Sequence, residues 1–402
     1  MVHFYNEKDF IDVDYLKNLG LKINKRDTTT VYDEKTKMDQ QRLNFVGIDV
    51  DKDNNMFVFL PYSYEVKSIK DDTKALMKTI YKHMQKRPEL YFGKDSKEIF
   101  DSNYPFSSFF EVYDYYLNYG LYVEYKDDIT IQKSGRLSWR NIIKKSQKYI
   151  INDNMFFAPL YYKKTSRSST FISDCMSYVL EYTIKKFGNL LGLGSLGLQT
   201  DNKNFINYKD QVIRELFIIK STSFNDITNK LIDSLIDFFK SVNIGGSYYL
   251  KHYNFAKIWE DMVTLYVNKK LVGINNKFLD LSGDGQENNF KKRTYYPNEI
   301  HPDQKMEPDC VSIIDNRLYI LDAKYYEPLD IDYKQICYYL FLKNYYDDIS
   351  EIYTSLISPS NVRKSDINFK MNEKFDPMLK DIQINIDYID IREVMKFWNE
   401  AK

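Results

Sequence analysis

The spacing of apolar residues predicts a short hairpin between Pro308 and Lys324. Two apolar runs, separated by a polar turn, make up this segment: residues 311–314, the turn 315–317 and residues 318–321. In a strand, residues two apart point to the same face, so Asp322 and Lys324 should project together. The partner strand should bring Asp309 alongside them. The pattern therefore predicts two carboxylates and an ammonium at one edge of a sheet.

Helical and extended patterns flank this hairpin. Apolar residues from Phe255 to Val267 recur at helical spacing, and Glu260 lies next to Trp259 in this segment. Ile331 to Leu340 predicts a second helix, with Gln335 and Tyr339 one turn apart on the same face, and 352–357 predicts a further strand. The predicted order is helix, strand, turn, strand, helix, strand.

Elsewhere the pattern predicts alternating strands and helices. Predicted hairpins or strands cover residues 45–60, 121–131 and 382–389, and predicted helices cover residues 71–86, 170–187, 208–220, 225–240 and 391–398. Ser223, with Asp226 three residues later, is the predicted cap of the 225–240 helix. Glycines 192, 194 and 197 follow a helix rather than a strand, so this G-x-G-x-x-G predicts a loop and not a dinucleotide site.

The predicted hairpin residues suit metal-dependent phosphodiester hydrolysis. Carboxylate oxygens hold a divalent ion, which activates water and shields phosphate charge; a lysine can orient that water or stabilise the same charge. A D-x-K match also arises by chance. However, charged residues that end a buried apolar run are costly unless they are paired or bound to a metal. Glu260 is equally consistent with an exposed helix acid, and Gln335 and Tyr339 with ordinary helix packing.

This order of elements, with these residues, resembles the core of the PD-(D/E)xK nuclease superfamily. The resemblance covers about residues 250–400. It implies catalytic roles for Asp309, Asp322, Lys324, Glu260 and Gln335, with Tyr339 matching more loosely. It further implies that Asp309, Asp322 and Glu260 would bind Mg²⁺ or Mn²⁺, and that the substrate is double-stranded DNA, with a homodimer able to cut both strands.

A narrower resemblance involves the first half of the chain. The predicted 45–60 hairpin ends at Pro61, and 135–144 reads Gly-Arg-Leu-Ser-Trp-Arg-Asn-Ile-Ile-Lys. Together with the nuclease-like segment, these stretches look like the LlaJI-type restriction endonucleases, which are related to McrC subunits. That resemblance implies a restriction or phage-defence subunit that acts with a separate McrB-like AAA+ GTPase. The chain itself contains no G-x-x-x-x-G-K-[S/T] motif, so it should not hydrolyse nucleotides through a P-loop.

We expect an α+β or α/β fold in three parts. Residues 1–135 would form a mixed N-terminal domain that binds DNA or a partner, and residues 136–245 a helical, locally basic connecting region. A hinge at Gly245-Gly246 would lead into a restriction-endonuclease-like α/β core over residues 246–402. Two basic segments are candidates for DNA contact: Arg140, Lys144 and Lys145, which lie among aromatic residues, and Lys291, Lys292 and Arg293. The alternative for the first segment, a solvated face over an ordinary core, is the more common arrangement.

Composition narrows the class of protein. The chain has 402 residues, of which 43% are hydrophobic and 28% charged, as in folded soluble proteins. Its net charge is zero, which argues against broad non-specific DNA binding but allows a local basic face. Three scattered cysteines without metal-type spacing disfavour a structural zinc and fit a reducing cytoplasm. No signal sequence or membrane-length apolar run is present, so a membrane location is not expected.

These observations favour a metal-dependent DNA endonuclease of a restriction or phage-defence system. Two other classes stay open on the sequence. In one, the nuclease fold is catalytically silent and serves as a DNA-binding or assembly subunit. In the other, the chain is an unrelated α/β binding protein whose acids are surface groups.

Overall fold

The structure is a computed structural model. It describes residues 2–33, 37–53, 55–91, 96–200, 204–242, 247–327, 333–346, 348–372, 374 and 381–401. The chain divides into two compact units. Unit 1 comprises residues 1–104, 190–192 and 245–402, and unit 2 comprises residues 105–189 and 193–244. Residues 1–104 and 245–402 thus share one unit although they are far apart in the sequence. The predicted Gly245-Gly246 hinge lies outside the described residues.

Unit 1 contains a five-stranded N-terminal sheet. Its strand order is β1 (Val2–Asn6), β6 (Met56–Leu60), β5 (Val46–Val50), β13 (Tyr248–His252) and β7 (Phe100–Ser102). β1 and β6 pair in parallel, and the other neighbours pair antiparallel. The β5–β6 pair confirms the predicted hairpin over residues 45–60. β5 and β6 are almost fully buried. Strands that are mostly apolar, without regular alternation of polar residues, are typically buried on both faces.

Smaller elements surround this sheet. A three-stranded sheet has the order β2 (Phe10–Ile11), β4 (Met38–Leu43) and β3 (Thr28–Asp33). The helices are α1 (Val13–Asn18), the 3₁₀ turn η1 (Lys25–Asp27), α2 (Ile69–Lys86), α3 (Pro88–Tyr91) and α4 (Ser96–Ile99). α2 confirms the helix predicted over residues 71–86. Ser68 caps it by accepting a hydrogen bond from the Asp71 amide.

A second five-stranded sheet forms the C-terminal part of unit 1. Its order is β16 (Cys310–Ile314), β17 (Arg317–Ala323), β18 (Glu351–Ser360), β20 (Gln383–Asp390) and β19 (Lys364–Lys370). The central pairs β17–β18 and β18–β20 are parallel, and the outer pairs are antiparallel. The remaining elements are α10 (Phe255–Lys270), the hairpin β14 (Gly273–Asn275) and β15 (Phe278–Asp280), α11 (Tyr333–Tyr345) and α12 (Ile391–Glu400). The predicted strands and helices of this region are confirmed. β18 extends beyond the predicted 352–357 strand and includes Ser358-Pro359-Ser360 at its end.

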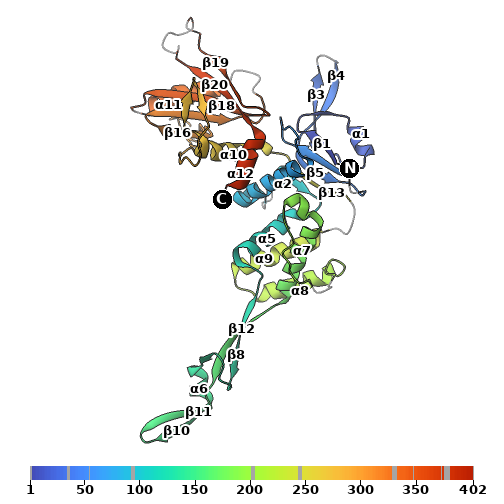
Figure 1. The fold of residues 1–402 in the computed structure, drawn as a ribbon, viewed down its shortest axis with the longest axis vertical. Coiled ribbons are helices and arrows are strands. Elements are labelled where there is room, and N and C mark those ends of the chain that lie inside the picture. The colour runs from blue at the N-terminus through green and yellow to red at the C-terminus, as the bar shows by residue number, and fades with distance from the viewer. Residues whose placement is uncertain are drawn as a thin grey trace. The chain divides into compact units, whose positions relative to one another are not determined.

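Helices α2 and α12 join the two sheets of unit 1, and they lie side by side (Figure 1). The Arg392 guanidinium donates to Asp72 at 2.8 Å, and the Tyr64 hydroxyl donates to the same carboxylate at 2.9 Å. Two turns further along α2, the Thr79 hydroxyl donates to the Asn399 side chain at 3.3 Å. The N-terminal sheet is therefore attached to the last helix of the chain.

Unit 2 consists of four longer helices and a β-rich arm (Figure 1). The helices are α5 (Phe106–Tyr119), α7 (Phe171–Leu191), α8 (Lys209–Thr222) and α9 (Asp226–Ser241). The arm contains a sheet of β8 (Glu124–Thr130), β12 (Tyr162–Ser168) and β9 (Arg136–Leu137), the helix α6 (Trp139–Lys145) and the hairpin β10 (Gln147–Ile151) and β11 (Asn154–Ala158). No described helix is both long and apolar enough to cross a membrane.

Two local predictions in unit 2 are wrong. Residues 121–131 do not form a hairpin, because residues 124–130 form the single strand β8, whose partner is the distant β12. Ser223 does not cap α9 through its side chain. The cap is Asn225, whose side-chain oxygen accepts from the Thr228 amide at 3.0 Å. Asn is as good an N-cap as Ser, so the sequence alone did not separate the two positions.

A buried ion pair anchors the N-terminal sheet. The Lys251 ammonium lies 2.6 Å from Asp27, and both side chains have no exposed surface. Tyr253 donates a further hydrogen bond to Asp27 at 2.8 Å. Removing one partner of such a pair leaves an uncompensated buried charge.

Replacing Lys251 by Met should lower the free energy of unfolding by about 3–5 kcal/mol. Lys396→Met is the matched control, because Lys396 forms an exposed pair with Glu400 at 4.0 Å. That control should change stability by no more than about 0.5 kcal/mol. Urea unfolding followed by circular dichroism measures both. Equal effects of the two substitutions would show that the buried ion pair contributes no more to the free energy of unfolding than the exposed pair does.

Candidate active site

The β16–β17 hairpin confirms the predicted strand–turn–strand at residues 308–324. Its turn residues Asp315 and Asn316 have φ values of 50° and 57°. Two consecutive residues in the left-handed region are typical of a two-residue type I′ hairpin turn, which suits the twist of the flanking strands. The register pairs Cys310 with Leu321. Asp309, just before β16, therefore lies beside Asp322 near the end of β17.

Asp322 and Lys324 interact directly. Their carboxylate and ammonium lie 2.6 Å apart, with 3% of the Asp322 side chain and 29% of the Lys324 side chain exposed. The Lys324 amide donates to the Ile357 carbonyl on β18 at 2.9 Å, which extends the parallel pairing past the end of β17. A buried carboxylate thus meets a half-exposed ammonium at the carboxyl end of a parallel strand, the edge where α/β folds commonly bind ligands.

Asp309 shares this edge with Asp322. The register places the two carboxyl groups side by side, and the Ala323 amide donates to Asp309 at 3.3 Å. Burial, together with the neighbouring Asp322 and Glu260 carboxyls, raises the pKa of Asp309 well above its usual range. Like charges in a desolvated site disfavour ionisation. The site therefore holds more negative charge than its own side chains neutralise.

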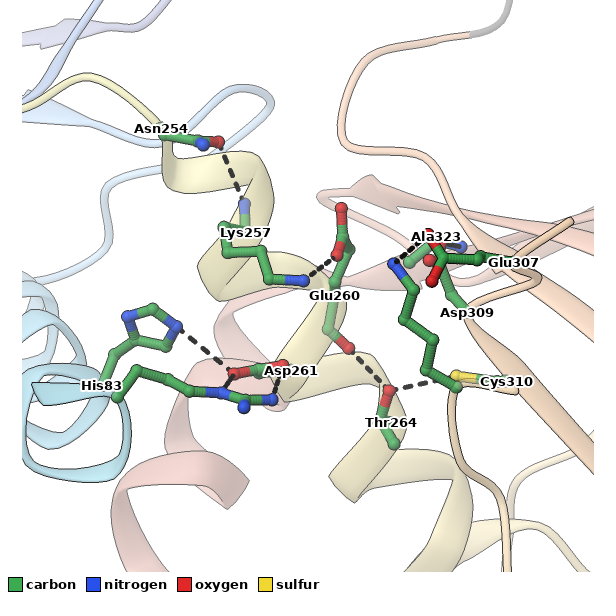
Figure 2. Close-up of polar contacts among 12 residues, drawn as sticks. His83, Asn254, Lys257, Glu260, Asp261, Thr264, Glu307, Asp309, Cys310 and Ala323 are labelled. Carbon is green, nitrogen blue, oxygen red and sulfur yellow. Dashed lines mark hydrogen bonds and ion pairs between the residues drawn. The ribbon is translucent and has the colours of Figure 1, made fainter. Parts of the chain in front are cut away.

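Glu260 approaches from helix α10. Figure 2 shows its carboxylate between Lys257, one turn earlier on the helix, and the segment that carries Asp309. The Lys257 ammonium lies 2.5 Å from Glu260. Burial opposes the charge on Lys257, but Glu260, Asp261 and Asp309 outweigh it and raise the pKa of this lysine. Lys257 was not among the predicted site residues, although its i, i+3 spacing from Glu260 is visible in the sequence.

Contacts on two sides fix the position of α10. The Thr264 hydroxyl donates to the Glu260 carbonyl at 2.8 Å and lies 3.1 Å from the Cys310 sulfur (Figure 2). The Trp259 indole donates to the Ile357 carbonyl at 3.3 Å. Asp261 receives the Arg87 guanidinium at 2.9 Å. α10 therefore connects the candidate site both to the β16–β18 strands and to helix α2.

Helix α11 carries two further residues that the sequence singled out, Gln335 and Tyr339. Gln335 is fully buried, and neither atom of its amide has a hydrogen-bond partner among the described residues. An unpaired buried amide is costly, and such groups call for a partner of another kind. Tyr339, one turn later, is also buried.

Sequence reasoning missed Lys334 and Tyr338 on the same helix. The Lys334 ammonium lies 5.4 Å from the Tyr338 ring centroid. Burial disfavours charge on Lys334, but Tyr338 and the Asp322 carboxylate outweigh it and raise the pKa of Lys334. The Asp322 and Asp309 charges also act on Tyr338, after burial, to raise its pKa. The i, i+4 spacing of this pair was the available signal, but it is common in helices.

The predicted DNA-contacting residues lie in both units. Arg140, Lys144 and Lys145 belong to α6 in the arm of unit 2. Lys291 to Arg293 belong to unit 1. There the Lys291 amide donates to the Val311 carbonyl on β16 at 3.4 Å, and the Val311 amide donates to the Lys291 carbonyl at 3.0 Å. Arg293 donates to the Tyr346 hydroxyl at 3.1 Å. The second basic segment therefore runs beside the strand that follows Asp309.

The donor set fits a hard divalent cation. The carboxyl groups of Asp309 and Asp322 are neighbours at the sheet edge, and a cation relieves the repulsion between carboxylates crowded at low dielectric. The described residues do not contain a preassembled group of three metal-ligating side chains. Glu260, the third predicted ligand, is engaged by Lys257.

The sequence matches a known family over most of its length. A family model described as LlaJI restriction endonuclease matches residues 45–399. The chain belongs to the LlaJI restriction endonuclease family. No curated protein matches the chain.

Two solved structures match this chain at low identity and low TM-score. One is a chain from a half-complex of a tetradecameric assembly of Thermococcus gammatolerans McrB AAA+ hexamers with bound McrC. It shows 11% identity and a TM-score of 0.40, with 99% of this chain and 98% of that chain covered. The other comes from the McrBC complex of the same organism. It shows 10% identity and a TM-score of 0.22, with 65% of this chain and 85% of that chain covered.

Neutralising Asp309 should stabilise the metal-free protein. A raised pKa means that the folded state favours protonated Asp309. The stabilisation that protonated Asp309 gives to the folded state is therefore present at low pH, and it is lost as pH rises through the raised pKa. At pH 8, Asp309→Asn should therefore raise the free energy of unfolding by about 1–2 kcal/mol. Asp366→Asn on β19 removes an exposed acid and is the control. Chemical unfolding with a chelator present measures both, and a destabilised Asp309→Asn would contradict the charge-crowding argument.

Proposed function

We propose that this chain is the metal-dependent DNA-cleaving subunit of a restriction system. Membership of the LlaJI restriction endonuclease family supports nuclease activity. One observation carries the assignment of the site: Asp309, Asp322 and Lys324 meet at one sheet edge, with Glu260 facing them from α10. Catalysis of phosphodiester hydrolysis needs such a concentration of hard oxygen ligands beside a cationic side chain.

In this proposal Asp309 and Asp322 hold a Mg²⁺ or Mn²⁺ ion, and Glu260 completes the ligand set when Lys257 releases it. The bound ion would supply an activated water and charge compensation at the phosphate. Lys324, held by Asp322, would direct its ammonium toward the attacked phosphate or the attacking water. Lys334 on α11 would bind or orient the DNA backbone, and the fully buried Gln335 amide would orient other groups of the site. The Asp322–Lys324 and Glu260–Lys257 pairs and the unpartnered Gln335 amide support these proposed roles.

Basic segments in both units would hold double-stranded DNA. Lys291 and Lys292 run beside β16, next to the proposed cleavage site, and Lys292 lies 4.0 Å from Glu307. Arg293 would contribute from the same segment, and Arg140, Lys144 and Lys145 would add contacts from α6. Phosphate contacts depend on such local positive charge and not on the net charge of the chain. A homodimer would allow cleavage of both strands.

An AAA+ GTPase partner of the McrB type completes the proposal. The chain has no P-loop motif of its own, and its sequence resembles McrC-related restriction subunits. The N-terminal region up to about residue 135 is proposed to contact the partner or DNA. Zero net charge argues against broad non-specific DNA binding beyond these local basic segments, so control of DNA engagement by a separate motor protein is physically reasonable.

Cleavage of plasmid DNA in the presence of Mg²⁺, the AAA+ partner and GTP tests the site. Asp322→Asn and Lys324→Ala should each reduce the cleavage rate by about 10²-fold or more while leaving the circular dichroism spectrum unchanged. The matched control Asp366→Asn removes an exposed acid from the same sheet and should cut at the wild-type rate. If Asp322→Asn retains full activity, the assignment is wrong. If the wild type binds DNA and its AAA+ partner but never cuts, the alternative of a silent nuclease-fold subunit is favoured.

The requirement for a partner has its own test. The purified chain with Mg²⁺ alone should cut weakly or not at all, and addition of the AAA+ protein encoded in the same system, with GTP, should start cleavage. A GTP analogue that is not hydrolysed serves as the control for motor action. Robust site-specific cutting by the chain alone would indicate a stand-alone restriction enzyme, and it would leave the active-site assignment intact.

A further inference from the structure

A buried glutamate of the N-terminal sheet holds the two tyrosines that directly follow Lys324. Glu7 comes directly after β1 and is 2% exposed. One of its carboxylate oxygens accepts the Tyr325 hydroxyl and the other accepts the Tyr326 hydroxyl, each at 2.8 Å. These residues are more than 300 positions apart in the chain. The contact therefore joins the first strand of the N-terminal sheet to the end of the catalytic strand β17.

Tyr325 is buried and makes further contacts with three residues. The Tyr325 hydroxyl, besides donating to Glu7, accepts the Tyr62 amide at 2.8 Å. The Tyr325 ring packs against Tyr326 and Phe255, with centroid distances of 4.8 Å and 5.5 Å. Phe255 is the first residue of α10, the helix that carries Glu260. Tyr325 thus links the segment that follows β17 to α10, and both of these elements contribute to the candidate site.

The charge of Glu7 is costly at this position. Burial raises its pKa, while Tyr326, Tyr325 and the nearby Lys8 act in the opposite direction. A buried carboxyl that only joined two sheets could be replaced by apolar packing without a penalty. Glu7 instead directs both of its oxygens at the residues after Lys324. The Lys324 backbone is fixed to β18 on one side, and Tyr325 and Tyr326 fix the following peptide units on the other.

We propose that Glu7 is a positioning residue for Lys324, acting through Tyr325 and Tyr326. This inference rests on the proposed nuclease function of the site. The N-terminal sheet would thereby set the geometry of the catalytic lysine, and any partner or DNA that shifts β1 would alter cleavage without touching the site. Groups that orient active-site residues in this way typically affect rate by about 10–100-fold.

Three substitutions and a matched control test the proposal. Glu7→Ala removes both hydrogen bonds. Glu7→Gln keeps an oxygen that accepts from Tyr325, and its amide can donate to the Tyr326 oxygen. Tyr326→Phe removes one bond at a side chain that is already 38% exposed, so the fold should tolerate it. The control is Asn399→Ala, which removes two hydrogen bonds that join α12 to α2, at 3.3 Å and 3.0 Å, far along the chain from Lys324.

In cleavage assays with the AAA+ partner and GTP, Glu7→Ala should lower kcat by about 10–100-fold with little change in KM for DNA. Tyr326→Phe should cause a smaller loss of the same kind. Glu7→Gln should recover most of the rate, and Asn399→Ala should behave like the wild type. A wild-type kcat for Glu7→Ala, or an equal loss for Asn399→Ala, would overturn the proposal.

Hydrogen exchange measured by mass spectrometry gives a readout that does not depend on activity. In Glu7→Ala, peptides that contain Tyr62 and residues 322–327 should exchange faster, because the Tyr62 amide loses its fixed acceptor. Unchanged exchange in both peptides would also overturn the proposal. In the cleavage assay, Lys324→Ala separates the proposed nuclease function from the positioning role of Glu7. If Lys324→Ala cuts like the wild type, the proposed function fails; if it is inactive while Glu7→Ala is fully active, only the positioning role fails.

Discussion

Charge balance at one sheet edge is the constraint on which the candidate site depends. Three carboxyl groups approach one another there, and two lysines lie among them. Lys324 pairs with Asp322 at 2.6 Å, and Lys257 pairs with Glu260 at 2.5 Å. Asp309 forms no ion pair with a described residue, and burial, followed by the neighbouring Asp322 and Glu260 carboxyls, raises its pKa. A divalent cation would satisfy the imbalance, because carboxylate oxygens are its preferred ligands.

The same constraint explains why the site needs a rigid frame. Like charges separate if the elements that carry them can move, so β16, β17 and α10 must be held together by other interactions. Trp259 and Thr264 hold α10 against the strands, and Arg87 holds it from the opposite flank through Asp261. Function and stability oppose each other here, as is common for active sites. The cost of charge crowding is offset by packing elsewhere in unit 1.

Local periodicity predicted much of this arrangement, and its failures have physical causes. The hairpin at residues 308–324 was predictable because strand parity and a two-residue turn are both encoded within 17 neighbouring residues. The strand β8 was mistaken for a hairpin because its true partner, β12, lies more than 30 residues downstream. Lys334 and Tyr338 were missed because helical spacing does not reveal which face of α11 meets the strands. The roles of Asp309, Asp322, Lys324, Glu260 and Gln335, and the three-part division of the chain, stay predictions.

Long-range pairing has the largest consequence for how the chain can be dissected. β13 pairs with β5 in the N-terminal sheet, and α10 begins only two residues after β13 ends. The sheet and the helix that carries Glu260 therefore form a continuous structure, reinforced by the buried pair of Lys251 and Asp27. A nuclease core cut out at residue 246 would lose the partners of β13 and the Glu7 contact with Tyr325 and Tyr326. The N-terminal sheet is for this reason a structural part of the candidate site, and substitutions on its surface, not deletions, are the way to examine its contacts with DNA or a partner.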